Sequence, residues 1–178
     1  DAGIVTGATS GSTGQPVRVE KLNSLYSPLQ HAISMLDHER HRRDARKTLG
    51  GYGPRTKDTD TARWGAPQSW FGPVGKSFGR NVTQHTIPEL YAALEQHRPA
   101  YVSAAPPMVQ ALAQAALDSG RPAPQIEQIL TYSARVTPEL RALARKVFGA
   151  RVVDRYSCEE CGQVALQCTK HDHYHVLG

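Results

Sequence analysis

Apolar residues return along the chain with two different periods, which predict strands and helices in succession. From residue 24 to residue 49 they recur every third or fourth position, and two glycines then end the pattern, which predicts one long helix. Before it, β-branched runs at 4–6 and 17–19 flank a loop of Gly, Ser and Thr, as in strand, loop and strand. Residues 50–82 are rich in Gly, Pro and Thr and predict an ordered but irregular segment.

The second half of the chain alternates strands and helices. The pattern predicts helices at 86–97, 106–120 and 137–149, and strands at 101–104, 128–132 and 151–156. Repeated strand, helix and strand units predict an α/β fold with a mainly parallel sheet and flanking helices. A small hairpin rich in Cys and His, from 164–168 and 174–176, is expected to follow. Ligands should gather at the carboxyl ends of the parallel strands.

Composition narrows the function classes only a little. The 178 residues are 39% hydrophobic, which suits one globular domain or a large subdomain, and no run of apolar residues is long enough to cross a membrane. We therefore expect a cytoplasmic protein. The net charge of +5 invites a nucleic-acid partner, but the basic run at 38–47 contains acids at helical spacing and favours a solvated helix face.

The loop between the first two predicted strands is the first candidate site. It reads Thr9-Ser10-Gly11-Ser12-Thr13-Gly14-Gln15-Pro16, with four hydroxyls and two glycines that together suit a cradle for phosphate oxygens. A plain mobile turn is one alternative. The glycine loop of a dehydrogenase is another, but its last required glycine is Thr13 here, and a strand rather than a helix follows.

The second candidate site follows the strand predicted at 151–156. Here Tyr156-Ser157-Cys158-Glu159-Glu160 places an aromatic ring and two carboxylates at the carboxyl end of the strand. A ring can stack on a base and a carboxylate can hold Mg²⁺, so the segment suits a nucleotide. The alternative is that Tyr156 only packs and the glutamates are only solvated.

The last candidate is a cluster of cysteines and histidines. The spacing of Cys168, His171 and His175 is compatible with Zn²⁺, and thiolate with imidazole favours that metal over Mg²⁺ or Ca²⁺. A fourth ligand is expected from Cys158, Cys161 or His173, or from chain beyond Gly178. Closed sets of Cys and His usually hold a fold together, so we expect a structural role. The alternative is a solvated loop of histidines beside a buried cysteine.

The phosphate loop and the acidic turn together resemble the signatures of adenylate-forming enzymes. The pattern Tyr, Ser, any residue, Glu, Glu with a following Gly is most similar to the phenylacetate-CoA ligase and capsule-biosynthesis branch. By this resemblance Tyr156 lies against adenine, and Glu160 coordinates Mg²⁺ and is catalytic together with Thr13. The resemblance also implies phosphate and nucleotide contacts from a wider set: Ser10, Gly11, Ser12, Thr13, Gly14, Ser133, Ala134, Ser157 and Glu159.

The same resemblance implies a structural zinc near Cys161 and Cys168, and an N-terminal adenylation core as the fold. The implied activity is ATP-dependent conversion of a carboxylic acid, such as an aryl acid, into an acyl-adenylate. Transfer of the acyl group to CoA or another thiol would follow. Val17 stands where the family often has Lys, so Arg18 or Lys21 is expected to supply the positive charge.

The resemblance also bears on how much of such an enzyme the chain represents. A ribose-binding Asp and a Lys on a mobile C-terminal domain are expected after these motifs, so residues 1–178 are expected to be a partial core with little turnover of its own. The competing hypothesis is a noncatalytic, zinc-stapled module that binds nucleotide or RNA.

Overall fold

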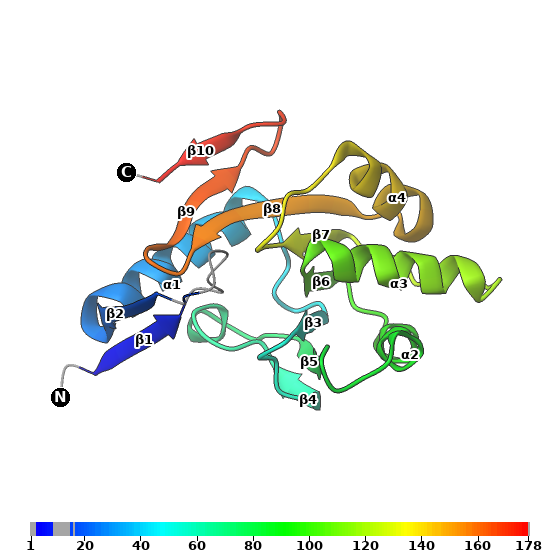
Figure 1. Cartoon of the computed structure of the whole chain (residues 1–178), viewed down its shortest axis with the longest axis horizontal. Helices are drawn as coiled ribbons and strands as arrows, with labels where there is room; N and C mark the ends of the chain where they lie inside the picture. The colour runs from blue at the N-terminus through cyan, green and yellow to red at the C-terminus, as the bar shows by residue number, and fades with distance from the viewer. Residues whose placement is uncertain (1–2, 9–14, 16, 178) are drawn as a thin grey trace. The chain divides into compact units, whose positions relative to one another are not determined.

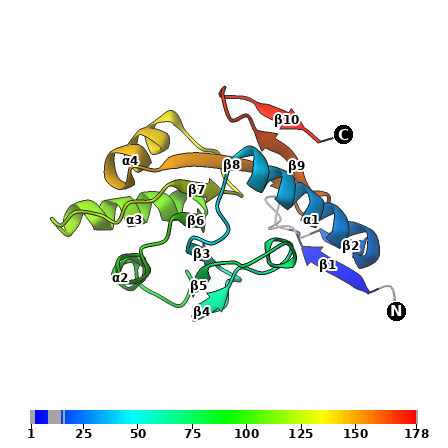
Figure 2. The same ribbon diagram turned by 180° about the vertical axis from the view of Figure 1, so that it is seen from behind.

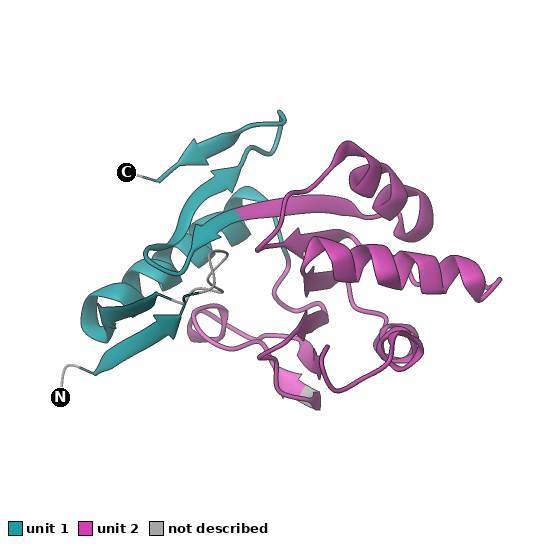
Figure 3. Ribbon diagram, viewed as in Figure 1, with its two compact units in different colours: residues 1–43, 156–178 teal, residues 44–155 magenta. Residues whose placement is uncertain are grey.

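The computed structural model describes residues 3–8, 15 and 17–177, which belong to two compact units (Figure 3). Unit 1 comprises residues 1–43 and 156–178, and unit 2 comprises residues 44–155. Within the described ranges, no helix is both long enough and apolar enough to span a bilayer.

Unit 2 is built on a mainly parallel sheet (Figure 1). Its strands lie in the order β8 (Arg151–Cys158, up to residue 155 in this unit), β7 (Gln128–Thr131), β6 (Tyr101–Ala104), β3 (Leu49–Gly53), β5 (Lys76–Asn81) and β4 (Thr59–Arg63). All neighbouring pairs are parallel except β4 and β5, which are antiparallel. The predicted α/β class with a mainly parallel sheet is confirmed.

Helices α2 (Ile87–His97), α3 (Pro106–Asp118) and α4 (Pro138–Phe148) connect successive parallel strands and pack side by side on one face of the sheet (Figure 1). Their starts follow from the sequence. The Thr86 amide donates to Glu89 Oε2 at 2.8 Å, and the Leu140 amide donates to Thr137 Oγ1 at 3.2 Å. The three helices predicted from residue 86 onward are confirmed to within a few residues.

The predicted helix at 24–49 is too long. α1 spans Asn23–Arg40, and the next residues leave helical geometry, with Arg42 at a positive φ of 51°. The apolar pattern itself ends at Leu36. A buried ion pair then fixes the end of the helix, because Arg43 Nη1 lies 2.6 Å from Asp37 Oδ2 and both side chains are almost fully buried.

The segment predicted as irregular, 50–82, instead contributes β3, β4, a short 3₁₀ helix (Gln68–Trp70) and β5. The two glycines that seemed to stop a helix belong to β3. A Cβ at Gly50 would lie 2.6 Å from Cζ of Phe78, so the glycine lets the buried ring of Phe78 lie against the strand. Periodicity could not show this, because the requirement comes from a neighbouring strand.

Unit 1 contains a hairpin of β1 (Ile4–Ala8) and β2 (Arg18–Leu22), followed by α1, and the antiparallel pair β9 (Gly162–Gln167) and β10 (Tyr174–Val176) (Figure 2). The strands predicted on either side of the Gly, Ser and Thr loop are thus confirmed as an antiparallel pair. The small Cys- and His-rich hairpin at the end of the chain is also confirmed.

A buried hydrogen bond ties β7 to β8 within unit 2. Thr131 is fully buried and donates through Oγ1 to Asp154 Oδ1 at 2.7 Å, while Asp154 is 8% exposed. The two residues are register partners in the parallel pair. A buried carboxylate needs such donors, because water cannot replace them.

We predict that Thr131→Val lowers the free energy of unfolding by about 1–3 kcal/mol, because it leaves Asp154 with one donor fewer in a buried site. Chemical denaturation measures this change. The matched control is Thr83→Val, which removes a 2.8 Å hydroxyl bond to Asn81 on the exposed surface and should cost less than about 0.5 kcal/mol. Equal losses in the two variants would contradict the prediction.

Candidate functional site

The structure describes the two strands that flank the predicted phosphate loop, β1 and β2. Ser10, Gly11, Ser12, Thr13 and Gly14 lie outside the described residues. β1 pairs with β2 so that Ala8 lies opposite Arg18, which fixes the point where the chain enters the loop beside the strand that follows it. The loop's neighbours can therefore be compared with the acidic turn.

The acidic turn of unit 1 lies against β1. A Cβ added to Gly7 would be 2.6 Å from Oε2 of Glu159 and 3.8 Å from Nζ of Lys21. The carboxylate and the ammonium group therefore both approach the backbone of β1 just before the loop. Glycine at position 7 leaves the space that the Glu159 carboxylate occupies.

Of the two cations expected to replace the family's Lys, Lys21 is the one beside Glu159. Its ammonium group lies 4.3 Å above the centre of the Tyr26 ring, a cation–π contact that helps to hold its position. Arg18 instead pairs with Glu20 at 3.2 Å, and both of these side chains are mostly exposed. The geometry favours Lys21 as the charged group nearest the acidic turn.

Gln30 of α1 holds the backbone of the turn between β8 and β9. Its Nε2 donates to the carbonyl of Cys161 at 3.1 Å, and its Oε1 accepts from the amide of Gln163 at 3.0 Å. Gly162 lies between them with φ of 77°, and a Cβ there would be 2.4 Å from Cδ of Gln30. Sequence reasoning missed Gln30, since a Gln on a polar helix face carries no signal of its own.

The remaining predicted residues of the turn are open to solvent. Tyr156 is 60% exposed and meets the Tyr174 ring edge-on at a centroid distance of 6.3 Å. Ser157 and Glu160 are exposed as well. Cys158 and Cys161 form no disulfide, and a hydrogen bond with Cys158 raises the pKa of the Cys161 thiol. An open ring face and an open carboxylate are what a nucleotide with its metal ion requires.

The end of the chain brings three potential metal ligands together. The ligand atoms of Cys168, His173 and His175 all lie within 4.8 Å of one another. The register explains this grouping. Tyr174 pairs with Gln167, so Cys168 falls opposite His173, and His173 and His175 are two residues apart on the same side of the strand.

Other contacts shape the same group. The Lys170 amide donates to Sγ of Cys168 at 3.5 Å, and the Cys168 amide donates to the His173 carbonyl at 2.8 Å. His171, which the spacing had selected, stacks on the His173 ring at a centroid distance of 5.7 Å. Within the described part of the chain, the group therefore combines Cys168 and His175 with His173, one of the expected fourth ligands, and does not include His171.

Ser133 and Ala134 lie directly after β7 in unit 2. Ser133 has a positive φ of 67°, an unfavourable conformation for a residue other than glycine, and both residues are exposed. The preceding Tyr132 hydroxyl donates to the Tyr52 carbonyl at 2.8 Å and anchors the turn to β3. Such backbone conformations are common at ligand sites, and the role of Ser133 and Ala134 as nucleotide contacts stays a prediction.

Solved structures with a similar fold include CoA ligases and an acyl-CoA synthetase. A 2-hydroxyisobutyryl-CoA ligase in complex with 2-HIB-AMP and CoA has a TM-score of 0.66 and 16% identity over 96% of this chain and 37% of its own. An anthranilate CoA ligase in complex with anthranoyl-AMP has a TM-score of 0.64 and 12% identity over 96% and 32%. A Brucella canis acyl-CoA synthetase has 0.61 and 15% over 94% and 30%.

The chain thus has the fold of part of these adenylate-forming ligases and spans about a third of their length. No protein-family model matches the sequence, and no curated protein matches it either.

We predict that Gln30→Ala accelerates hydrogen exchange at the Gln163 amide about fivefold or more, because that amide loses its acceptor. Exchange followed by mass spectrometry or NMR measures the rate. The matched control is Gln114→Ala, which removes an exposed bond to Asp118 in unit 2 and should leave Gln163 unchanged. An unaltered rate in Gln30→Ala would show that the clamp does not hold the turn.

Proposed function

We propose that the chain forms the ATP-binding part of an enzyme that activates a carboxylic acid. The enzyme would use cytoplasmic ATP to form an acyl-adenylate and then pass the acyl group to CoA or another thiol. Residues 1–178 would supply part of the adenylation core, and the mobile domain that completes such an enzyme would come from elsewhere in the protein.

One observation carries the proposal: the acidic turn lies beside the strand that leads into the predicted phosphate loop. The Glu159 carboxylate and the Lys21 ammonium group approach Gly7, two residues before the loop begins. A dehydrogenase or a plain turn gives no reason for a carboxylate and an ammonium group at this place. A site for a nucleoside triphosphate with Mg²⁺ explains this arrangement, because it needs hydrogen-bond donors for the phosphates close to carboxylates that bind the metal.

The residues would divide the work by their chemistry. The backbone amides and hydroxyls of the loop bind the phosphates, and Lys21 adds positive charge near them. Glu160, exposed and acidic, suits Mg²⁺, which neutralises phosphate charge when bound. The exposed Tyr156 ring would stack on adenine. Nucleotidyl transfer needs mainly this positioning and charge neutralisation.

The solved neighbours support the acid class. One ligase of similar fold was solved with CoA and 2-HIB-AMP, the acyl-adenylate of a hydroxy acid. Another was solved with anthranoyl-AMP, the acyl-adenylate of an aryl acid. An aryl acid is the substrate class that we favour, since the motifs are most similar to the phenylacetate-CoA ligase branch. A noncatalytic nucleotide- or RNA-binding module remains the competing function and is an outcome of the first test below.

A structural zinc ion is the second part of the proposal. One thiolate and two imidazoles on a short hairpin suit Zn²⁺ in chemistry. Their ligand atoms, within 4.8 Å of one another, need to close only slightly, because neighbouring ligand atoms around tetrahedral zinc lie about 3–4 Å apart. The Lys170 amide that donates to Sγ of Cys168 stabilises a thiolate there. The ion would hold the β9–β10 hairpin closed.

We predict that the chain binds ATP only with Mg²⁺ and that Glu160→Ala weakens binding about tenfold or more, because the metal loses a carboxylate. Calorimetric titration measures the affinity. The matched control is Glu39→Ala, an exposed glutamate of α1 in the same unit, which should bind ATP normally. Binding of a short RNA that falls steeply with added salt, in place of ATP, would favour the competing function.

We predict that one equivalent of Zn²⁺ raises the melting temperature and that His173→Ala abolishes this rise, whereas His171→Ala keeps it. The reason is that His173, and not His171, shares a ligand group with Cys168 and His175. Metal analysis of the purified chain and thermal melts with and without a chelator provide the measurement. Retained zinc in His173→Ala together with lost zinc in His171→Ala would reverse the assignment.

A further inference from the structure

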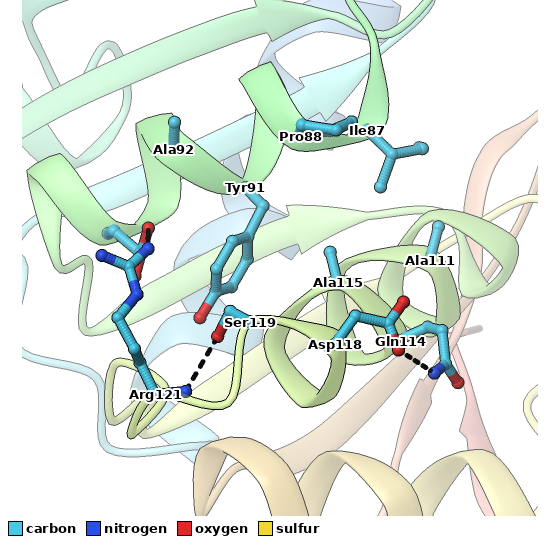
Figure 4. A pocket seen from close by; sticks show the side chains of 11 residues that line it. Ile87, Pro88, Tyr91, Ala92, Ala111, Gln114, Ala115, Asp118, Ser119 and Arg121 are labelled. Carbon is cyan, nitrogen blue, oxygen red and sulfur yellow. Dashed lines mark hydrogen bonds and ion pairs between the residues drawn. The ribbon is translucent and has the colours of Figure 1, made fainter.

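A groove between α2 and α3 of unit 2 contains none of the predicted site residues. It encloses about 670 Å³, within the usual range for small-molecule sites of about 300–1,000 Å³. Its apolar part is lined by Ile87, Pro88, Tyr91, Ala92, Ala111 and Ala115, which face one another from the two helices (Figure 4).

The groove is wide because its helix positions carry small side chains. Ala92, Ala111 and Ala115 each reach only one carbon beyond the backbone, so they leave a smooth apolar wall rather than a filled interface. Ile87 and Pro88 close one end at the start of α2. A flat ring suits such a space better than a branched or strongly polar group.

Tyr91 contributes a buried polar group to the groove. The residue is only 4% exposed, and its hydroxyl has no hydrogen-bond partner among the residues that the structure describes. A buried hydroxyl without a partner costs free energy, which an acceptor on a ligand would recover. The neighbouring Arg121 side chain is 66% exposed and can turn away to admit one.

The other polar groups of the groove already have partners. Arg121 pairs with Glu95 at 2.8 Å, and Gln114 donates to Asp118 at 2.8 Å. The Ser119 hydroxyl donates to the Ala116 carbonyl at 2.7 Å. A ligand therefore meets a closed polar rim and an apolar interior, with the Tyr91 hydroxyl as the group left to recognise it.

The charge of the rim selects against anions. Two carboxylates, of Glu95 and Asp118, face one guanidinium, of Arg121, and that guanidinium is already paired. A carboxylate or a phosphate entering the groove would lose its hydration and meet an excess of negative charge. This separates the groove from the site for acid and ATP, which must accept anions.

We infer that the α2–α3 groove is a second binding site, which takes an uncharged, flat aromatic molecule bearing one hydrogen-bond acceptor. The ring lies along the alanine wall, and its acceptor takes the hydrogen bond of Tyr91. The site requires neither ATP nor a metal ion, so it stands independently of the proposed ligase function.

Amide shifts of the isotope-labelled 178-residue chain, titrated with benzamide, test the inference. Benzamide has a flat ring and a neutral carbonyl acceptor, and we expect saturable shifts at amides around Tyr91, Ala115 and Ser119. Benzoate has the same ring with a carboxylate, and we expect it to leave these amides unmoved even if it shifts others at an acid site. Tyr91→Phe should bind benzamide about three- to tenfold more weakly, the loss of one neutral hydrogen bond.

Two further variants separate binding from folding. Ala115→Leu fills the groove and should abolish the shifts while the melting temperature is kept, and Tyr26→Phe, a tyrosine of unit 1, should bind benzamide like the unsubstituted chain. Three results would each overturn the inference: no benzamide shifts in the groove, equal binding of benzoate there, or undiminished affinity in Tyr91→Phe.

Discussion

The turn that carries Glu159 and Glu160 keeps its place because Gln30 satisfies two backbone groups on either side of Gly162. Its side-chain amide donates one hydrogen bond and accepts another, so a single group serves both a backbone carbonyl and a backbone amide. These two hydrogen bonds fix the turn to α1. In the same unit, the Glu159 carboxylate of this turn lies against Gly7 of β1. The proposed chemistry of the turn depends on that placement, since carboxylates on an unsupported turn would have no defined distance from the loop.

The sequence predicted the elements whose causes are local. Thr86 and Thr137 start their helices because their side chains and neighbours cap the first turn, and the alternation of strands and helices follows from hydrophobic period. The prediction was wrong between 41 and 82, where the causes are not local. Gly50 makes room for the Phe78 ring, and the end of α1 depends on the ion pair of Asp37 and Arg43. The spacing of apolar residues predicts neither contact.

The candidate site shows the same division. Residue types indicated a metal at the last hairpin, but counting along the sequence favoured His171, whereas strand geometry groups His173 and His175 with Cys168. Positions two apart on a strand face the same side, but only the register of β9 and β10 shows which of them lie opposite Cys168. Likewise, the sequence identified the tyrosine and the glutamates of the turn by their residue types. The contacts of Gly7 and Gln30, and the preference for Lys21 over Arg18, became known only from the structure.

The departures from the adenylate-forming pattern make sense as a change in charge balance. The resembling family has a threonine in the acidic turn and often a lysine after the loop, where this chain has Glu159 and Val17. In the proposed ATP site, these two changes would remove a cation and add an anion. An uncompensated carboxylate there would repel a triphosphate. In the proposed site Lys21, held over Tyr26 and close to the same point of β1, would supply the missing cation. With Glu159 balanced in this way, Glu160 is left exposed on the turn as the carboxylate suited to a metal ion.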